Sequence, residues 1–227
     1  MNFLQKMKND FARDKAILKT LSFRQKVRYI KDYYKGRFFI LFCICLIGFY
    51  AGDMWMTMQR ETVLEGFFTN DGQDLFPAGE ITEEFSQRLG LSKNQQVIFD
   101  DSLFVQIGSG IEYHTSSQSK IIAYISAREL DFLVTTEELT RYYLPNFPIY
   151  DLEEFLPNEM FEQLKDQIIY AADGTGEQKA CAVSMEGSRF AKRGTSSEEP
   201  PHYLMVFSYT KHSDAMIEFL KYAFEID

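Results

Sequence analysis

Three histidines are the side chains of this sequence best suited to bind a metal ion. His114, His202 and His212 lie far apart in the chain, and none has a Cys or His neighbour at the spacing of a metal ligand. Zinc sites are built from clusters of such side chains. We therefore expect no metal ion, and nothing else in the sequence indicates a cofactor.

Cys181 is the thiol best placed to act as a nucleophile. Cys43 and Cys45 stand inside an apolar run, where cysteine behaves as a small hydrophobic residue. Cys181 has no histidine or other base close to it in sequence, and no G-x-S-x-G or phosphate-binding glycine motif occurs. A buried, inert thiol fits this pattern better than a catalytic one. We therefore predict that the protein is not an enzyme, with chemistry at Cys181 as the alternative.

Acidic pairs and tyrosines are two further groups with chemical potential. The carboxylates of a pair such as Asp100 and Asp101 are adjacent in sequence, so they need not share a face or a proton. Such pairs are typical of solvated surfaces and helix starts. Tyr142, Tyr143 and Tyr150 could stack against a ligand, but core or rim packing is the commoner role of tyrosine.

The formal charge of −9 is divided unevenly along the chain. Residues 1–37 contain eleven Lys/Arg and three Asp/Glu, a net charge of +8, whereas residues 38–227 contain thirteen and thirty, a net charge of −17. An acidic segment of this kind repels phosphate, so we expect no nucleic-acid partner. Hydrophobic residues make up 45% of the sequence, which is enough for a packed core.

Residues 38–58 predict a transmembrane helix. The first part, FFILFCICLIGFYAG, has 15 residues without a charge, and MWMTM follows Asp53. Fifteen helical residues span about 22 Å, so the segment must continue past Asp53 to cross a hydrocarbon core of about 30 Å. The basic residues before it obey the positive-inside rule. We therefore expect a single-pass protein of the cell membrane, with a cytoplasmic N-terminus, an extracytoplasmic C-terminal domain and the lipid bilayer as a partner.

Three alternatives to this anchor fit the sequence less well. A cleaved signal peptide has a shorter basic region and small residues before the cut. A lipoprotein has its cysteine at the end of the apolar run, whereas Cys43 and Cys45 lie in the middle. A buried core helix leaves the flanking charges unexplained.

The basic cytoplasmic segment, residues 1–37, is expected to be helical. Ser22 can cap a helix through residues 24–35. Upstream of it, an irregular apolar side permits an amphipathic helix on an anionic membrane surface. A plain topology signal with a solvated face is the other interpretation.

Residues 59–227 predict one α/β domain. Because strand and helix patterns alternate, they favour a layered structure around a mainly parallel sheet. The expected strands lie near 61–70, 96–105, 131–135, 167–171, 180–184 and 203–208, and the expected helices near 81–91, 118–130, 137–144, 152–160 and from Ser213 onward.

Three stretches of this domain, taken in order, resemble extracytoplasmic solute-binding proteins. They are IIAYISARELDFLVTTEELTRYYL, IYDLEEFLPNEMFEQLKDQIIYA and YLMVFSYTKHSDAMIEFLKYAF. The resemblance implies a lobe of the type 2 periplasmic-binding fold. The chain between Tyr150 and Tyr203 is too short for a whole second lobe, so a single reduced lobe is expected.

In such a fold, ligands gather at the carboxyl ends of strands, where the strand order switches. The resemblance therefore points to five candidate ligand-binding residues: Asn70, Ser109, Tyr113, Thr135 and Thr136. We expect a solute-binding-like domain that binds a small-molecule ligand or assists a membrane partner such as a transporter. The alternative is a structural or protein-interaction domain on the cell surface without a ligand, which the missing second lobe favours.

Overall fold

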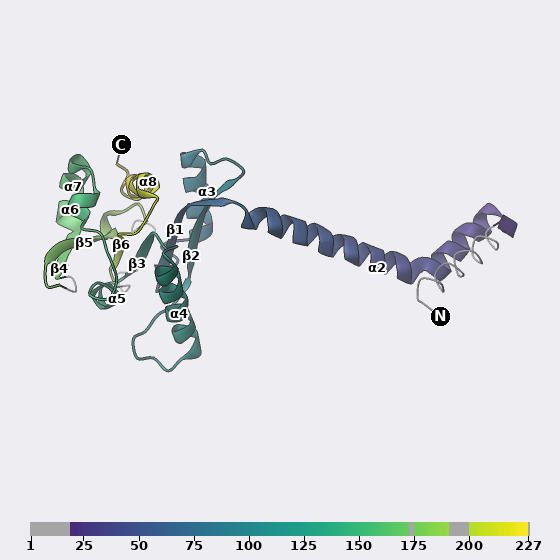
Figure 1. Ribbon diagram of the computed structural model, residues 1–227, viewed down its shortest axis with the longest axis horizontal. Coiled ribbons are helices and arrows are strands. Elements are labelled where there is room, and N and C mark those ends of the chain that lie inside the picture. The colour runs from purple at the N-terminus through teal and green to yellow at the C-terminus, as the bar shows by residue number, and fades with distance from the viewer. Residues whose placement is uncertain (1–18, 173–174, 191–199, 227) are drawn as a thin grey trace. The chain divides into compact units, whose positions relative to one another are not determined.

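The computed structural model describes residues 19–172, 175–190 and 200–226 (Figure 1). The chain divides into two compact units, Met1–Gln59 and Arg60–Asp227. The amphipathic helix considered for the N-terminal part of the basic segment lies outside the described residues.

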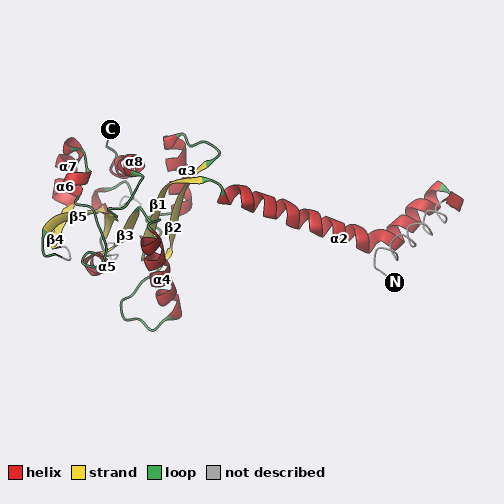
Figure 2. Cartoon of the chain, in the orientation of Figure 1, coloured by secondary structure: helices red, strands yellow, loops and turns green. Residues whose placement is uncertain are grey.

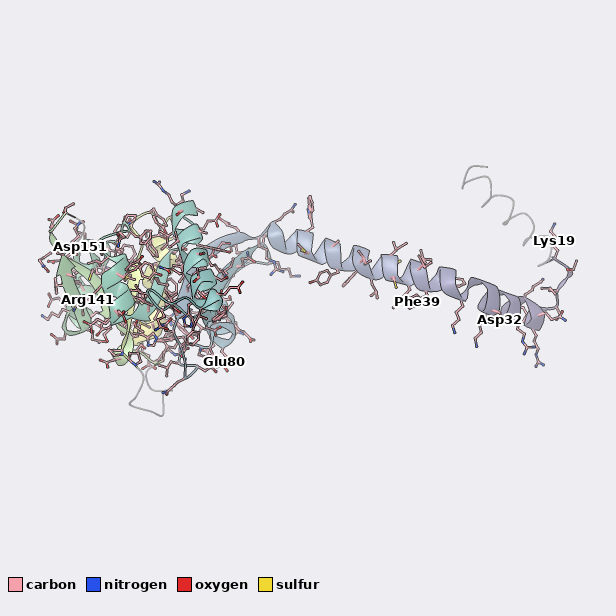
Figure 3. The ribbon with its side chains drawn as sticks, turned by 90° about the horizontal axis from the view of Figure 1, so that it is seen from below. Lys19, Asp32, Phe39, Glu80, Arg141 and Asp151 are labelled. Atoms are coloured by element: carbon pink, nitrogen blue, oxygen red, sulfur yellow. The ribbon has the colours of Figure 1, made fainter. Side chains whose placement is uncertain are left out.

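The described part of the first unit contains one long helix, α2, Phe23–Met58. Ser22 stands at its start, as the sequence predicts, and its carbonyl accepts the Lys26 N–H at 2.9 Å. The N–H and the hydroxyl of Ser22 both donate to Gln25 Oε1 at 3.0 Å, which is one half of a capping box. The apolar side chains further along α2 are exposed, and Phe39 projects outward from the helix (Figure 3).

The prediction of a transmembrane helix at residues 38–58 is wrong. In the part of the chain that the structure describes, no helix is both long enough and apolar enough to cross a membrane. The charge-free run of α2 has 15 residues and covers about 22 Å, and its extension depended on continuing past Asp53. The same finding contradicts the predicted single-pass topology and the cell-membrane location with an extracytoplasmic domain.

The second unit is built on a mixed sheet, whose described strands run in the order β2-β1-β3-β6-β5-β4 (Figures 1 and 2). The strands are β1 Glu61–Thr69, β2 Gln95–Leu103, β3 Phe132–Thr136, β4 Ile168–Ala172, β5 Gln178–Ser184 and β6 His202–Val206. Strand β1 pairs in parallel with β2 and β3, whereas the pairs β3–β6, β6–β5 and β5–β4 are antiparallel. The α/β class is confirmed.

The expectation of a mainly parallel sheet is wrong for the half of the sheet formed by β6, β5 and β4. A parallel connection needs a crossover of a dozen or more residues. The chain between β4 and β5, residues 173–177, is too short for such a crossover, so these two strands form an antiparallel pair.

Helices cover both faces of the sheet (Figure 1). One face carries α3 Ala78–Leu89, α6 Leu152–Phe155, α7 Asn158–Leu164 and α8 Ser213–Phe224, and the other carries α4 Glu112–Ala127 and α5 Glu137–Tyr143. Each face has its own hydrophobic core. Phe68 and Phe219 belong to the first core, and Leu133, Met205 and Phe207 belong to the second. Helix α4 begins at Glu112, earlier than its apolar pattern predicts.

The order β2-β1-β3 creates a switch point between β1 and β3. The chain passes from β1 through α3 to β2, and then returns through α4 to β3 on the other side of β1. The two crossovers run in opposite directions along the sheet, so α3 and α4 cover opposite faces. Sheets with this arrangement commonly bind ligands at the carboxyl ends of the two strands.

Candidate ligand-binding site

The carboxyl ends of β1 and β3 are packed rather than open. Thr135 is 0% exposed, and its hydroxyl accepts a hydrogen bond from Thr69 Oγ1 at 2.7 Å. The expectation that Thr135 lies near a surface cleft is therefore wrong, because its side chain pairs with a neighbour inside the sheet. Thr136 is half-buried before α5, and its carbonyl accepts the Thr140 hydroxyl at 3.0 Å.

The side-chain amide of Asn70 forms two hydrogen bonds with the backbone of another segment. Its Nδ2 donates to the Val105 carbonyl at 2.9 Å, and its Oδ1 accepts the Val105 N–H at 2.8 Å. The residue has a φ of 60°, a conformation that asparagine adopts more readily than most residues. The amide therefore ties the end of β1 to the segment that follows β2.

Ser109 and Tyr113 form hydrogen bonds within the connection from β2 to α4. Ser109 Oγ accepts the Ile111 N–H at 3.2 Å and lies 3.1 Å from His114 Nδ1. The Tyr113 hydroxyl donates to the Ser102 carbonyl, and its side chain is 52% exposed. Hydrogen bonds thus join Asn70 to the start of this connection. None of the hydrogen bonds of Asn70, Ser109 or Tyr113 described here has Thr135 as a partner.

His202 is a residue at the switch point that the sequence analysis did not select. Strand β6 runs antiparallel to β3, which brings its first residue opposite Thr136. The imidazole is buried, with Nε2 3.1 Å from the Thr69 carbonyl oxygen and the ring 5.3 Å from that of Phe76. Its partners lie far away in sequence, so spacing alone gave no signal.

A cavity of about 320 Å³ lies on the α5 side of the sheet. Its wall is the segment 144–150, which follows α5, and its other lining residues are Lys179, Cys181 and Ser208. Lys179 and Cys181 stand two positions apart on β5, so their side chains point to the same face. Nothing in the sequence indicates that Tyr150 and Cys181 line the same cavity.

The wall begins where α5 is forced to end. Pro145 cannot continue a helix, because it lacks an N–H and its ring clashes with the preceding turn. The side-chain amide of Asn146 donates to the Tyr142 carbonyl at 2.6 Å, and the Phe147 N–H donates to the Tyr143 carbonyl at 3.1 Å. The Tyr142 and Tyr143 carbonyls at the end of α5 are therefore satisfied, and the segment leaves the helix in a fixed direction.

The far end of the wall is held by the last residue of β6 and the two residues that follow it. Ser208 donates its N–H to the Pro148 carbonyl at 3.0 Å, and Tyr150 donates to the Val206 carbonyl at 2.9 Å. Between them, Ile149 forms a bridge with Phe207. Both ends of the wall are thus attached to the fold, so the cavity is preformed.

Cys181 is a buried thiol, as the sequence predicts. It is buried in the second core, and Sγ donates to the Ile169 carbonyl at 3.3 Å. Burial, partly offset by hydrogen bonds and by the charge of Arg141, raises the pKa of the thiol to about 11. The group is protonated near neutral pH and does not supply a thiolate nucleophile.

Charge at the cavity comes chiefly from one side chain. Of the described residues in its lining, Lys179 alone is charged. Its Nζ lies 3.9 Å from Glu177 Oε2, and the Glu177 side chain is 72% exposed. Arg141 and Asp151, both labelled in Figure 3, act on the nearby Cys181 thiol in opposite senses.

A pair formed by the buried Asp131 and the half-buried His212 lies outside the cavity. Asp131 Oδ2 is 2.9 Å from His212 Nδ1, and the same carboxylate accepts the Glu65 N–H at 2.8 Å and the Thr210 hydroxyl. The carboxylate therefore joins β1, the start of β3 and the approach to α8. Within the described residues, no group of three His, Cys, Asp or Glu is arranged to hold a metal ion. We interpret the pair as a structural brace.

Comparison with known proteins gives no relative: no family model, curated protein or solved structure matches the chain. The resemblance to solute-binding proteins stays a prediction. The geometry of the cavity is therefore the best guide to function.

Proposed function

We propose that the second unit is a non-catalytic binding domain, which takes a small molecule into the cavity beside β5. The observation that carries the proposal is the preformed cavity itself. Its volume of about 320 Å³ falls at the lower end of the range of ligand sites, about 300–1,000 Å³. Because hydrogen bonds hold both ends of its wall, little ordering of the chain has to accompany binding.

The chemistry of the lining supports binding rather than catalysis. The wall consists mainly of aliphatic, proline and aromatic residues, and polar and apolar atoms contribute similar shares of the surface that lines the cavity. The thiol of Cys181 is protonated and engaged with a backbone carbonyl.

Ligand-detected NMR on the full chain tests this proposal. A library of small fragments with positive, negative and neutral members should yield hits by saturation transfer. Ser208→Phe places a bulky ring at the cavity rim, where Ser208 is exposed, and should abolish the hits. Ser119→Phe is the matched control, because Ser119 is an exposed serine on α4 that does not line the cavity.

A library that gives no hits, or hits that survive in Ser208→Phe, would refute binding in the cavity. Folding of both variants is checked by their thermal unfolding. A loss of hits in both variants alike would point to a general effect of a surface phenylalanine, which also contradicts the proposal.

A protein-interaction domain is the second candidate function. The connection before α4 and the first turn of that helix expose three large apolar side chains, Ile107, Ile111 and Tyr113, at 39%, 56% and 52%. Exposed apolar patches of this kind mark protein-interaction surfaces when they are contiguous. Quantitative binding of a purified partner should then be lost in Ile111→Asp and kept in Ser208→Phe. The proposal of a ligand domain expects no such pattern.

A further inference from the structure

We infer that the ligand of this cavity is a small amphipathic anion, with its charge at Lys179 and its apolar body against the rings of segment 144–150. Simple aromatic monocarboxylates have this chemistry. The inference rests on the proposed function and narrows it to one class of ligand.

Lys179 provides the charge for which an anion is the natural partner. Its ammonium group has three donors and forms charge-assisted hydrogen bonds with carboxylates. One of its partners is the largely exposed Glu177, whose Oε2 lies 3.9 Å from Lys179 Nζ. Exposed ion pairs contribute little to stability, so a ligand carboxylate can join or replace Glu177 at small cost.

The wall offers an apolar surface of fixed shape. Phe147 packs against the buried Tyr143 with ring centroids 5.7 Å apart, whereas the Tyr150 ring packs against Phe155 of α6 in the core of the other face, with centroids 4.8 Å apart. Two prolines, Pro145 and Pro148, add rigid rings with no side-chain freedom to lose. A flat apolar body therefore gains contacts without ordering the wall.

Ser208 supplies a second polar group to the lining. The Ser208 backbone N–H is already engaged with the Pro148 carbonyl, while its hydroxyl lies at the exposed rim. A hydroxyl can donate to the second oxygen of a carboxylate. Asn146 is less suited to this role, because its amide donates to the Tyr142 carbonyl.

The charge of the surrounding domain limits the size of the anion. Residues 38–227 carry a net charge of −17, which repels polyanions over a long range. Arg141 and Asp151 act in opposite senses nearby, so the local positive charge amounts to little more than Lys179. A monoanion is therefore favoured over a nucleotide, a polyphosphate or an acidic peptide.

Isothermal titration of the full chain with benzoate, benzamide and benzylamine tests the inference. The three probes share a ring and differ in charge. We expect benzoate to bind about tenfold more tightly than neutral benzamide, and benzylamine to bind most weakly. Lys179→Met, which keeps most of the length of the side chain, should reduce benzoate affinity to that of benzamide. Lys179→Arg should keep the preference for benzoate.

Lys165→Met is the control variant, since Lys165 is an exposed lysine on the surface that pairs with Glu162 at 2.6 Å and does not line the cavity. It should leave the three affinities unchanged. Equal binding of benzoate and benzamide by the native chain would overturn the anion class while leaving the cavity as a binding site. If no probe binds and the fragment screen is also empty, the proposed function fails as well.

Discussion

The ring of Phe132 on β3 lies against the backbone of Gly66 on β1. The two residues are direct partners in the parallel register, and a Cβ added to residue 66 would stand 2.0 Å from the ring atom Cζ. Phe219 of α8 stacks on the other side of the ring, with centroids 4.7 Å apart. The ring is therefore held between a strand and a helix, and it has no space to retreat.

Gly66→Ala should destabilise the domain by about 3 kcal/mol, because the added methyl group overpacks this contact. Chemical denaturation monitored by circular dichroism measures the change. Gly79→Ala is the control: no heavy atom lies within 4 Å of the added Cβ, and alanine is the better helix former. A Gly66→Ala protein with unchanged stability would show that β1 and β3 do not pair in this register.

Glu65 should make the stability of the domain depend on pH. Burial, reinforced by Glu129 and Asp131 and opposed by Lys120, raises the pKa of Glu65 from 4.5 to about 7. The folded state thus binds a proton more tightly than the unfolded state. The stabilisation of the folded state by this proton is fully present below pH 4.5. As the pH rises towards 7 it is lost, and the free energy of unfolding falls by up to about 3 kcal/mol.

Glu65→Gln removes the titrating group, so the free energy of unfolding should vary less between pH 5 and pH 8. The variant should exceed the native chain in stability by the largest amount at pH 8. Urea unfolding at a series of pH values measures this, and Glu154→Gln, an exposed glutamate on α6, should follow the native profile. A native profile that rises through this range, with no change in Glu65→Gln, would contradict the assignment.

Asp131→Ala should destabilise the domain by about 3 kcal/mol or more, since it leaves several buried donors without an acceptor. The affected donors are the Glu65 N–H, the Thr210 hydroxyl and the His212 ring. Thermal unfolding is the measurement, and Asp166→Ala, at an exposed position, should remain within about 0.5 kcal/mol of the native chain. A mild effect at Asp131 would mean that water satisfies these donors.

Leu133 shows where sequence reasoning succeeds. The run DFLVT predicts a covered strand, and Leu133 is fully buried in β3. Leu133→Ala should cost about 2–5 kcal/mol through lost transfer energy and the cavity left behind, measured by denaturant unfolding. Local patterns of apolar residues set such burial, so they could place the strands and most helices of the second unit.

The orientation of the strands and the site needed information that local patterns lack. Thr135 was expected at a cleft, but the side chain that pairs with it, Thr69, lies on a different strand. The cavity arises where segment 144–150 lies over β5, a strand that begins 28 residues after Tyr150. The two prolines of this segment predict that the helix ends there. They do not predict which strand the segment packs against.

The most direct measurement of the central claim is the alkylation rate of a thiol placed at the cavity rim. Ser208→Cys, labelled with iodoacetamide and followed by peptide-resolved mass spectrometry, separates this position from Cys43, Cys45 and Cys181. With saturating benzoate or benzamide, we expect the rate at residue 208 to fall several-fold, while Ser119→Cys on α4 labels at an unchanged rate. An unaltered rate at residue 208 with both probes would contradict binding in the cavity.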